Sequence, residues 1–329
     1  MSADTLPDRT VDAVVIGGGA AGLNGGLMLA RSRRSVVVID GGTPRNAPAE
    51  AVHGLLGLDG TPPAELYRRG REEVRGYGGT VVTGTVAAAS ATEPSPEGDL
   101  RFSVTLTDGR ELTARRLLVA TGTRDVLPDV PGLAAHWGRG VVHCPYCHGW
   151  EVRDEPIGIL AVGPVSTHQA LLFRQLTDDV VYFTRRTELD REARARLDAL
   201  DVRVVDSDVE EVLTAADGGI EGVRLSDGKV VARRVLAVGS TLAPRMQGLE
   251  ALGLTLEDLP HGVGRRVVSG VAGSTEVPGV WVAGNVTDPM AQVGASAAAG
   301  AMSGAHINAH LAAADADAAL AARIVGAGR

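Results

Sequence analysis

The sequence predicts an α/β protein of two Rossmann-like dinucleotide-binding domains, with the second inserted into the first. Three observations support this prediction. A strand, a glycine-rich turn and a helix open the chain, the same order of elements returns after about residue 125, and a segment near 265–285 leads back to the first domain. We therefore expect residues 1–124 and 248–329 to form the first domain and residues 125–247 the second.

The first strand–turn–helix–strand unit is typical of nucleotide binding. Gly17, Gly19 and Gly22 follow the β-branched run 11–16 in the pattern G-x-G-x-x-G, and Asp40 ends the next strand. Gly17 allows the tight turn, Gly19 lets the backbone approach a pyrophosphate, and Gly22 lets the helix pack closely on the strand. The helix N-terminus faces the phosphates, and Asp40 can accept hydrogen bonds from a ribose hydroxyl pair.

The rest of the first domain follows in order. Residues 43–60 form a polar, turn-rich loop and residues 66–77 a helix. Residues 79–91 and 101–123 are predicted strands, and "TDGR" is the turn of a hairpin. The apolar strand "LLVATGT" ends in small residues, where a dinucleotide backbone often lies.

The second domain repeats this organisation. "PIGILAVGPVSTHQALLFRQL" is again strand, turn and helix, and "GIEGVRLSDGKVVARRVLAVG" echoes "RFSVTLTDGRELTARRLLVATG" of the first domain. Residues 291–311 form a helix of small residues. We expect the Ala/Asp tail after about residue 312 to be frayed, with no further redox element.

Composition limits the class of function. The net charge of −8 leaves no basic surplus to neutralise phosphates, so we expect no nucleic-acid partner. No apolar run reaches the roughly 18 residues of a membrane span. The polar, acidic start does not resemble a signal peptide. We expect a cytoplasmic protein, in which structural disulfides are rare.

The chain contains two cysteines, Cys144 and Cys147, three residues apart in "HCPYCH". A CxxC pair in such a protein indicates redox chemistry, with half a zinc site as the alternative. There is no second CxxC, and one turn would have to hold all the ligands, so we expect no metal. A helix beginning at this pair, with Pro145 suited to its first turn, would lower a thiol pKa.

These motifs resemble the low-molecular-weight thioredoxin reductase family over nearly the whole chain. The resemblance rests on "IGGGAAG", "VATGT", the CxxC pair and "GVWVAGNVTDPMAQVGASAAAG". It implies an FAD-binding first domain, an NADPH-domain-like second domain that carries the CxxC pair, and a homodimer. The implied FAD contacts are Gly17, Gly19, Ala20, Ala21, Gly22, Asp40, Gly41, Arg45, Asn46, His53, Val82, Thr121, Gly122, Gly284, Asn285, Gln292 and Val293.

One implied contact differs in type from the family. Family members carry Asp where this chain has Asn285. An amide can still form hydrogen bonds with ribityl or phosphate oxygens, so we keep Asn285 as an FAD contact.

The second glycine turn departs from the family pattern. Gly163 keeps the first glycine position, but Val165 and His168 occupy the other two. A side chain at the second position would obstruct phosphates, and Pro164 removes an N–H donor. Arg185 and Arg186 stand where reductases place arginines for the 2′-phosphate, yet acidic residues crowd them; two solvated surface arginines are the alternative. We infer that NADPH binding is impaired.

The segments "CPYCHGWE" and "DGGTPRN…HGLLGLDG" resemble the FAD-dependent dithiol oxidases of the gliotoxin, holomycin and romidepsin type. That resemblance implies that Cys147 lies against the flavin and that Cys144 faces a small-molecule dithiol. A substrate thiolate attacks Cys144, and the second substrate thiol closes the product disulfide. Oxygen takes the electrons and gives hydrogen peroxide.

Histidines supply the candidate bases for this reaction. His148 titrates near neutrality and is the first candidate, His143 the second; a surface or capping histidine is the alternative for His148. His53 is expected at the flavin or the substrate, unless it is a loop histidine without function. His306 and His310, spaced i, i+4, fit a helix surface or dimer contact better than a metal pair.

Two other functions fit the same motifs. The chain could be a disulfide reductase that receives electrons from NADPH or ferredoxin. It could also be a flavin-binding redox sensor without turnover. The motifs do not identify the dithiol substrate.

Overall fold

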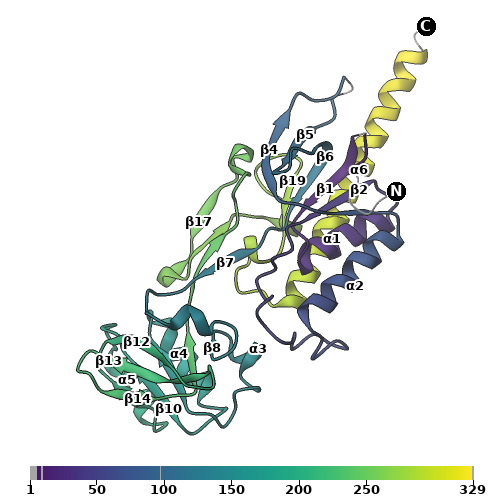
Figure 1. Cartoon of the computed structure of the whole chain (residues 1–329). Helices are drawn as coiled ribbons and strands as arrows, with labels where there is room; N and C mark the ends of the chain where they lie inside the picture. Colours follow the sequence, from purple (N-terminus) through teal and green to yellow (C-terminus); the bar gives the residue numbers. More distant parts are fainter. Residues whose placement is uncertain (1–5, 9, 97, 328–329) are drawn as a thin grey trace.

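The computed structural model describes residues 6–8, 10–96 and 98–327 and shows two α/β units joined by a narrow connection (Figure 1). Among these residues, the first unit holds a seven-stranded sheet in the order β3-β2-β1-β6-β5-β4, with β19 also paired to β6. Parallel pairs join β3, β2, β1, β6 and β19, whereas β5 pairs antiparallel with β4 and β6. The strands are β1 (Val11–Ile16), β2 (Val36–Asp40), β3 (Thr80–Thr83), β4 (Val86–Thr92), β5 (Arg101–Leu106), β6 (Glu111–Val119) and β19 (Val280–Val282).

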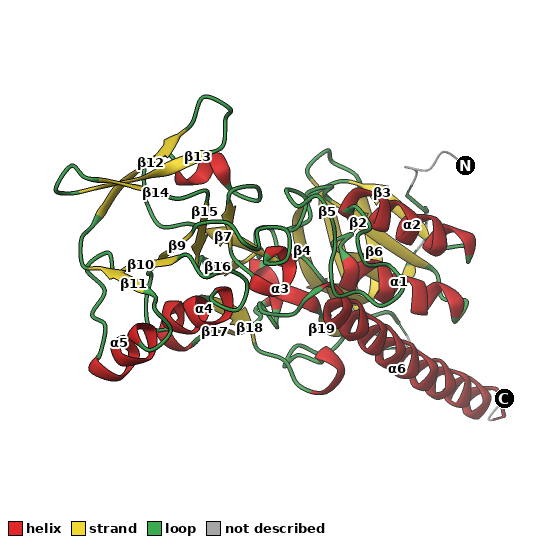
Figure 2. Ribbon diagram, turned by 90° about the horizontal axis from the view of Figure 1, so that it is seen from below, coloured by secondary structure: helices red, strands yellow, loops and turns green. Residues whose placement is uncertain are grey.

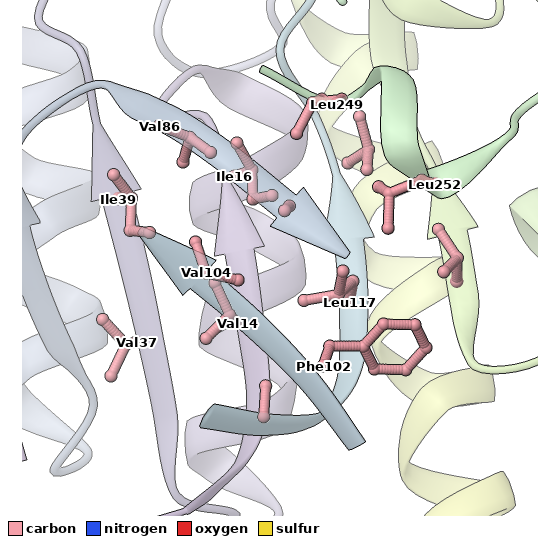
Figure 3. Close-up of a cluster of buried hydrophobic side chains, with 14 of the residues drawn as sticks. Val14, Ile16, Val37, Ile39, Val86, Phe102, Val104, Leu117, Leu249 and Leu252 are labelled. Atoms are coloured by element: carbon pink, nitrogen blue, oxygen red, sulfur yellow. The ribbon is translucent and has the colours of Figure 1, made fainter. Parts of the chain in front are cut away.

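The alternation of side chains along β1 divides the core of this unit into two layers. Val14 and Ile16 belong to one buried cluster, which Figure 3 shows together with Phe102, and Ala13 and Val15 belong to the other. Three helices lie side by side over the second layer (Figures 1 and 2). They are α1 (Ala20–Arg31), α2 (Pro63–Gly76) and α6 (Val293–Ala327).

The second unit repeats the parallel pattern in a five-stranded sheet, in the order β11-β10-β9-β15-β8, beside a three-stranded antiparallel sheet, β12-β13-β14, within the described residues. The elements are β8 (Val141–Val142), α3 (Pro145–His148), β9 (Ile157–Leu160), α4 (Val165–Phe173), β10 (Val180–Phe183), α5 (Arg191–Asp198), β11 (Arg203–Val205), β12 (Val209–Thr214), β13 (Ile220–Leu225), β14 (Val230–Ala232) and β15 (Val235–Val238). The predicted α/β fold class is confirmed.

Two antiparallel strands, β7 (Thr123–Val126) and β16 (Thr241–Pro244), connect the two units. After β16 the chain returns to the first sheet through β19, as the inserted arrangement predicts. The exact domain boundaries stay predictions. The remaining short elements are β17 (Leu256–Asp258), β18 (Arg265–Val267) and the 3-10 turns Leu133–His136, Glu250–Leu252, Pro260–Gly262, Val271–Gly273 and Gly284–Val286.

The expectation of a frayed tail after residue 312 is wrong. Helix α6 continues to Ala327 and extends beyond the body of the first unit (Figure 1). Alanine is the strongest helix former, and the carboxylate of Asp315 forms ion pairs with Arg34 and Arg115, both at 2.6 Å. Propensity and these two contacts with the body together explain the continued helix.

Candidate cofactor and thiol site

A cavity of about 1750 Å³ lies between the two units and is lined by both. It opens at the carboxyl ends of β1, β2 and β6, where open parallel sheets bind ligands. It brings together the predicted residues Gly17, Gly19, Ala20, Ala21, Asp40, Gly41, Arg45, Asn46, His53, Thr121, Gly122, Cys144, Cys147, His148, Gly284, Asn285, Gln292 and Val293.

Two predicted contacts do not line the cavity. A Cβ atom on Gly22 would lie 1.8 Å from the carbonyl oxygen of Gly17, so this glycine allows α1 to pack against the turn. The side chain of Val82 is fully buried in the core of the first unit. Neither residue presents a side chain to the cavity, and their FAD contacts stay predictions.

The first glycine turn fits a dinucleotide such as FAD. A Cβ on Gly17, which has φ +118°, would lie 2.3 Å from the carbonyl oxygen of Ala120, so glycine is required there. A Cβ on Gly19 would meet no protein atom within 4 Å, which leaves space for phosphates at the start of α1. The hydroxyl oxygen of Thr121, also on the cavity wall, is buried without a partner.

Asp40 and Asn46 also line the cavity, and each has a hydrogen-bond partner that the sequence did not reveal. One carboxylate oxygen of Asp40 accepts from the N–H of Gly42 at 2.8 Å, and the other lies 3.0 Å from Arg71. The carbonyl oxygen of the Asn46 side chain accepts from the hydroxyl of Tyr67 at 2.9 Å. That bond leaves the amide nitrogen of Asn46 as a donor at the cavity wall.

Asn285 has a more specific role than expected. Its amide nitrogen donates to the carbonyl oxygens of Asp288, Pro289 and Ala291 at 3.0, 3.3 and 2.8 Å. The N–H groups of the Asn285 amide are therefore used in bonds to the 288–291 turn. Only the side-chain oxygen of Asn285 is left to accept a hydrogen bond from a ligand. The expected donation to a phosphate does not fit, whereas acceptance from a ribityl hydroxyl does. An aspartate here would face three carbonyl oxygens.

The two thiols of the CxxC pair differ in ionisation. Both cysteines are free and half-buried, Cys144 directly before α3 and Cys147 within it. The hydrogen bond from Cys147 lowers the pKa of Cys144 to about 7, aided by the N–H groups of Cys147 and Tyr146 and the charge of Arg45, against the effect of burial. Donation to Cys144 and burial raise the pKa of Cys147. Cys144 is thus the thiolate of the reduced pair.

Both candidate bases are held neutral by burial. Burial lowers the pKa of His148, with Glu151 acting in the opposite sense. Nε2 of His148 is buried without a hydrogen-bond partner, and the residue lines the cavity. Burial also lowers the pKa of His143, followed by the charge of Arg45. Gln169 donates to the carbonyl oxygen of His143 at 2.7 Å and so fixes the residue before Cys144.

His53 connects the loop after β2 to the cysteine segment. Its Nδ1 lies 3.4 Å from Asp59 of the same loop, and its Nε2 lies 3.3 Å from Glu151, which follows α3. The ring lines the cavity, but both nitrogens face carboxylates. A cofactor contact of His53 therefore stays a prediction.

His306 and His310 pack against the body of the first unit. Trp281 donates to Nδ1 of His306 at 2.9 Å, and Arg116 donates to Nδ1 of His310 at 3.1 Å. Both rings also lie edge-on to Trp281. The described residues contain no group of three or more metal-ligating side chains. Both histidines are exposed residues of α6 that contact the first unit, and a role in a dimer contact stays a prediction.

The second glycine turn is built differently from the first. Val165 begins α4 and lines the cavity, while the hydroxyl of Ser166 accepts from the N–H of Val162 at 3.0 Å. Arg185 donates to the carbonyl oxygen of Ala161 at 3.2 Å, and the exposed Arg186 pairs at 3.0 Å with Asp208, which lies outside the acidic segment expected to crowd it. The turn therefore presents the side chain of Val165 where the first turn has Gly19, and impaired NADPH binding stays a prediction.

Comparison with known proteins agrees with this architecture. The family model described as pyridine nucleotide-disulphide oxidoreductase matches residues 11–305. Thioredoxin reductase tcpT of Claviceps purpurea (strain 20.1) is 33% identical over 283 residues, covering 84% of this chain and 86% of that protein. Thioredoxin reductase sirT of Leptosphaeria maculans is 30% identical over 296 residues, covering 86% and 88%.

The structure is also similar to the crystal structure of HlmI. The TM-score is 0.89 at 41% identity, with 98% of this chain and 99% of that one covered. Along the part of the chain that the structure describes, no helix has the length and apolar character needed to cross a membrane. The chain belongs to the pyridine nucleotide-disulphide oxidoreductase family, among its thioredoxin reductase-like members, as its motifs predicted.

Proposed function

We propose that this protein is an FAD-dependent dithiol oxidase that closes an intramolecular disulfide in a small natural-product dithiol. Oxygen is the electron acceptor, and one dithiol and one oxygen molecule give one disulfide and one hydrogen peroxide. The observation that carries the proposal is the contrast within one cavity. The first glycine turn leaves open space at Gly19, and the CxxC pair lines the same cavity, whereas the second turn carries the side chain of Val165 at the position that corresponds to Gly19.

The ionisation of the pair suits the thiol chemistry. A substrate thiolate attacks Sγ of Cys144 in the oxidised pair, the S–S bond breaks, and Cys147 leaves with the bonding electrons and is protonated, as its raised pKa favours. The second substrate thiolate then attacks the first substrate sulfur and expels Cys144. A thiol of low pKa leaves faster, so the pKa of about 7 at Cys144 favours this closure. Bound FAD would take the two electrons as the enzyme disulfide re-forms and would pass them to oxygen.

The substrate loses two protons in each turnover, and the site holds neutral imidazoles to accept them. His148 lines the cavity with its Nε2 unpaired, and His143 stands directly before Cys144. The predicted FAD contacts that line the cavity stay part of this proposal, as do a homodimeric assembly and a cytoplasmic location.

An oxygen electrode tests the proposal. The purified yellow protein is mixed with a reduced small dithiol, dithiothreitol or dihydrolipoamide, without NADPH. We expect oxygen uptake with one peroxide per oxygen, and catalase should return half of the oxygen consumed. The absence of both oxygen uptake and peroxide would reject the oxidase.

The alternative function is a disulfide reductase fed by NADPH or ferredoxin. The similarity to tcpT and sirT, both named thioredoxin reductases, favours it. Anaerobic bleaching of the flavin by NADPH, or by reduced ferredoxin, would support a reductase over an oxidase.

A further inference from the structure

Both crossings between the two units meet at one carboxylate, which a single guanidinium group binds. Arg45, in the loop after β2, donates through Nε and Nη2 to the two carboxylate oxygens of Asp125, at 2.8 and 2.7 Å. Asp125 lies on β7, and its side chain is 8% exposed. The hydroxyl of Ser240, directly before β16, donates to the same carboxylate at 2.6 Å. The bidentate pair of Arg45 and Asp125 therefore joins the first unit to β7. Ser240 adds the start of β16 through the same carboxylate.

A third bond of Arg45 reaches the cofactor side of the cavity. Its Nη1 donates to the carbonyl oxygen of Pro289 at 3.0 Å, the oxygen that also accepts from Asn285. The turn around Pro289 carries Met290, Ala291 and Gln292 on the cavity wall. With three N–H groups used on protein partners, Arg45 is better placed to organise the site than to bind a cofactor phosphate.

The charge of Arg45 acts on the cysteine pair from the same place. It lowers the pKa of Cys144 after the larger effects of the Cys147 hydrogen bond and the α3 N–H groups, and it also lowers the pKa of Cys147 and of His143. The titratable groups that face this region are His143, His148 and Asp125, with His53 and Glu151 acting on His148. Arg45 is the cation that acts on both thiols.

We propose that Arg45 is a positioning residue with two linked actions. Its fork to Asp125 holds the CxxC-bearing unit in one orientation over the cofactor cavity, and its charge favours the thiolate of Cys144. A lysine could supply the charge but not the two parallel bonds, because an ammonium is a point donor without the planar fork. The two actions can therefore be separated by substitution.

The test has two readouts, the alkylation of Cys144 and the rate of trypsin cleavage, and neither needs turnover. A failure of this inference is therefore distinct from a failure of the oxidase proposal. Holoprotein is reduced, freed of reductant under nitrogen and alkylated with iodoacetamide between pH 5 and 9. Mass spectrometry follows Cys144. Limited trypsin digestion reports the connection, because Arg124 lies on β7 and Arg245 directly follows β16. Flavin absorbance and circular dichroism confirm that each variant is folded.

Three variants and one control are expected to change the alkylation midpoint and the cleavage rate in different ways. Arg45→Met should raise the alkylation midpoint by about one pH unit and speed cleavage at Arg124 or Arg245 about tenfold. Arg45→Lys should keep the midpoint and speed cleavage. Asp125→Asn should leave the midpoint at or below that of the wild type, because the charge of Arg45 is released, and should also speed cleavage. Arg69→Met removes an exposed arginine of α2 and should change neither readout.

The results divide cleanly. If Arg45→Met leaves both the midpoint and the cleavage rate at wild-type values, the inference is wrong. If Arg45→Met and Asp125→Asn raise the midpoint equally, the effect is a general loosening of the site, and the charge role is wrong. Faster cleavage in all three variants, with a raised midpoint in Arg45→Met alone, supports both actions.

Discussion

The two glycine turns of this protein occupy equivalent places in two related sheets, yet they offer a ligand different surfaces. At the first, Gly19 leaves open space before α1. At the second, Val165 stands at the corresponding point, and Ser166 closes the turn by accepting from Val162. Topology alone therefore does not create a nucleotide site. The side chains at a few turn positions decide whether phosphates can approach the backbone.

The comparison also separates two properties that the family combines in its second unit, a CxxC pair and a nucleotide site. The CxxC pair is retained there and lines the cavity between the units, whereas the turn beside it carries Val165 and His168 where the family pattern has small residues, which we propose weakens pyrophosphate binding. A redox pair without a nucleotide site next to it needs electrons from another source. In our proposal that source is the substrate dithiol.

The largest effect is expected when the thiol of Cys144, which the second unit retains, is removed. Cys144→Ser should lower oxygen uptake with a small dithiol by about a thousandfold or more, because no mixed disulfide can form. Flavin absorbance should be unchanged, since the first turn is untouched. Retention of more than a tenth of the wild-type rate would show that the pair is not the electron path.

Exchanging one residue between the turns tests their difference directly. Gly19→Val gives the first turn the residue of the second, and its side chain would enter the space left for phosphates. We expect the ratio of flavin to protein absorbance to fall at least tenfold. The fold should survive, because a Cβ there meets no protein atom within 4 Å and the lost helix cap costs only about 1 kcal/mol.

Val165→Gly is the matched control for this exchange. It alters the second turn and should leave flavin content at the wild-type level. Equal flavin loss in both variants, or none in Gly19→Val, would mean that the two turns do not differ in the way proposed.

Removal of His148, the candidate base beside the CxxC pair, should have a smaller effect on turnover. His148→Gln should lower kcat by about a hundredfold, since the imidazole that takes a substrate proton is lost. Burial lowers the pKa of His148 from its ordinary value of about 6.5, and the neutral ring is the active form. Wild-type activity should therefore hold down to pH 6.5 and fall below it. An unchanged acid limb in the His148→Gln profile would assign that limb to another group, with His143 the next to test.

The smallest expected effect is on stability, and it should concentrate in the second unit. Burial lowers the pKa of both His143 and His148 below the unfolded value of about 6.5. The unfolded chain then binds more protons near pH 6, so the free energy of unfolding falls as pH drops below 6.5. The free energy of unfolding measured in urea should be lower at pH 5.5 than at pH 7.5. The double variant His143→Gln, His148→Gln should reduce that difference, and an undiminished difference would contradict this account.

The sequence predicted local features of this fold well and its long-range contacts poorly. Hydrophobic alternation and the glycine spacing identify β1, α1 and β2, because these signals lie within one short stretch of chain. The extension of α6 was missed, since its ion pairs from Asp315 to Arg34 and Arg115 join residues about 280 and 200 positions apart.

The same limit applies to the candidate site. The CxxC pair and most cavity-lining residues follow from motifs. The bonds of Arg45 to Asp125, of Arg71 to Asp40 and of His53 to Glu151 depend on how the loop after β2 folds over the cavity. No spacing rule in the sequence encodes those pairs.

The central claim is that electrons enter from a dithiol and not from NADPH. Anaerobic stopped-flow absorbance near 450 nm tests it in one experiment with the same holoprotein and two donors. We predict rapid bleaching by the reduced small dithiol and no bleaching by NADPH at equal concentration. Bleaching by NADPH that is faster than bleaching by the dithiol would contradict the account and support a reductase.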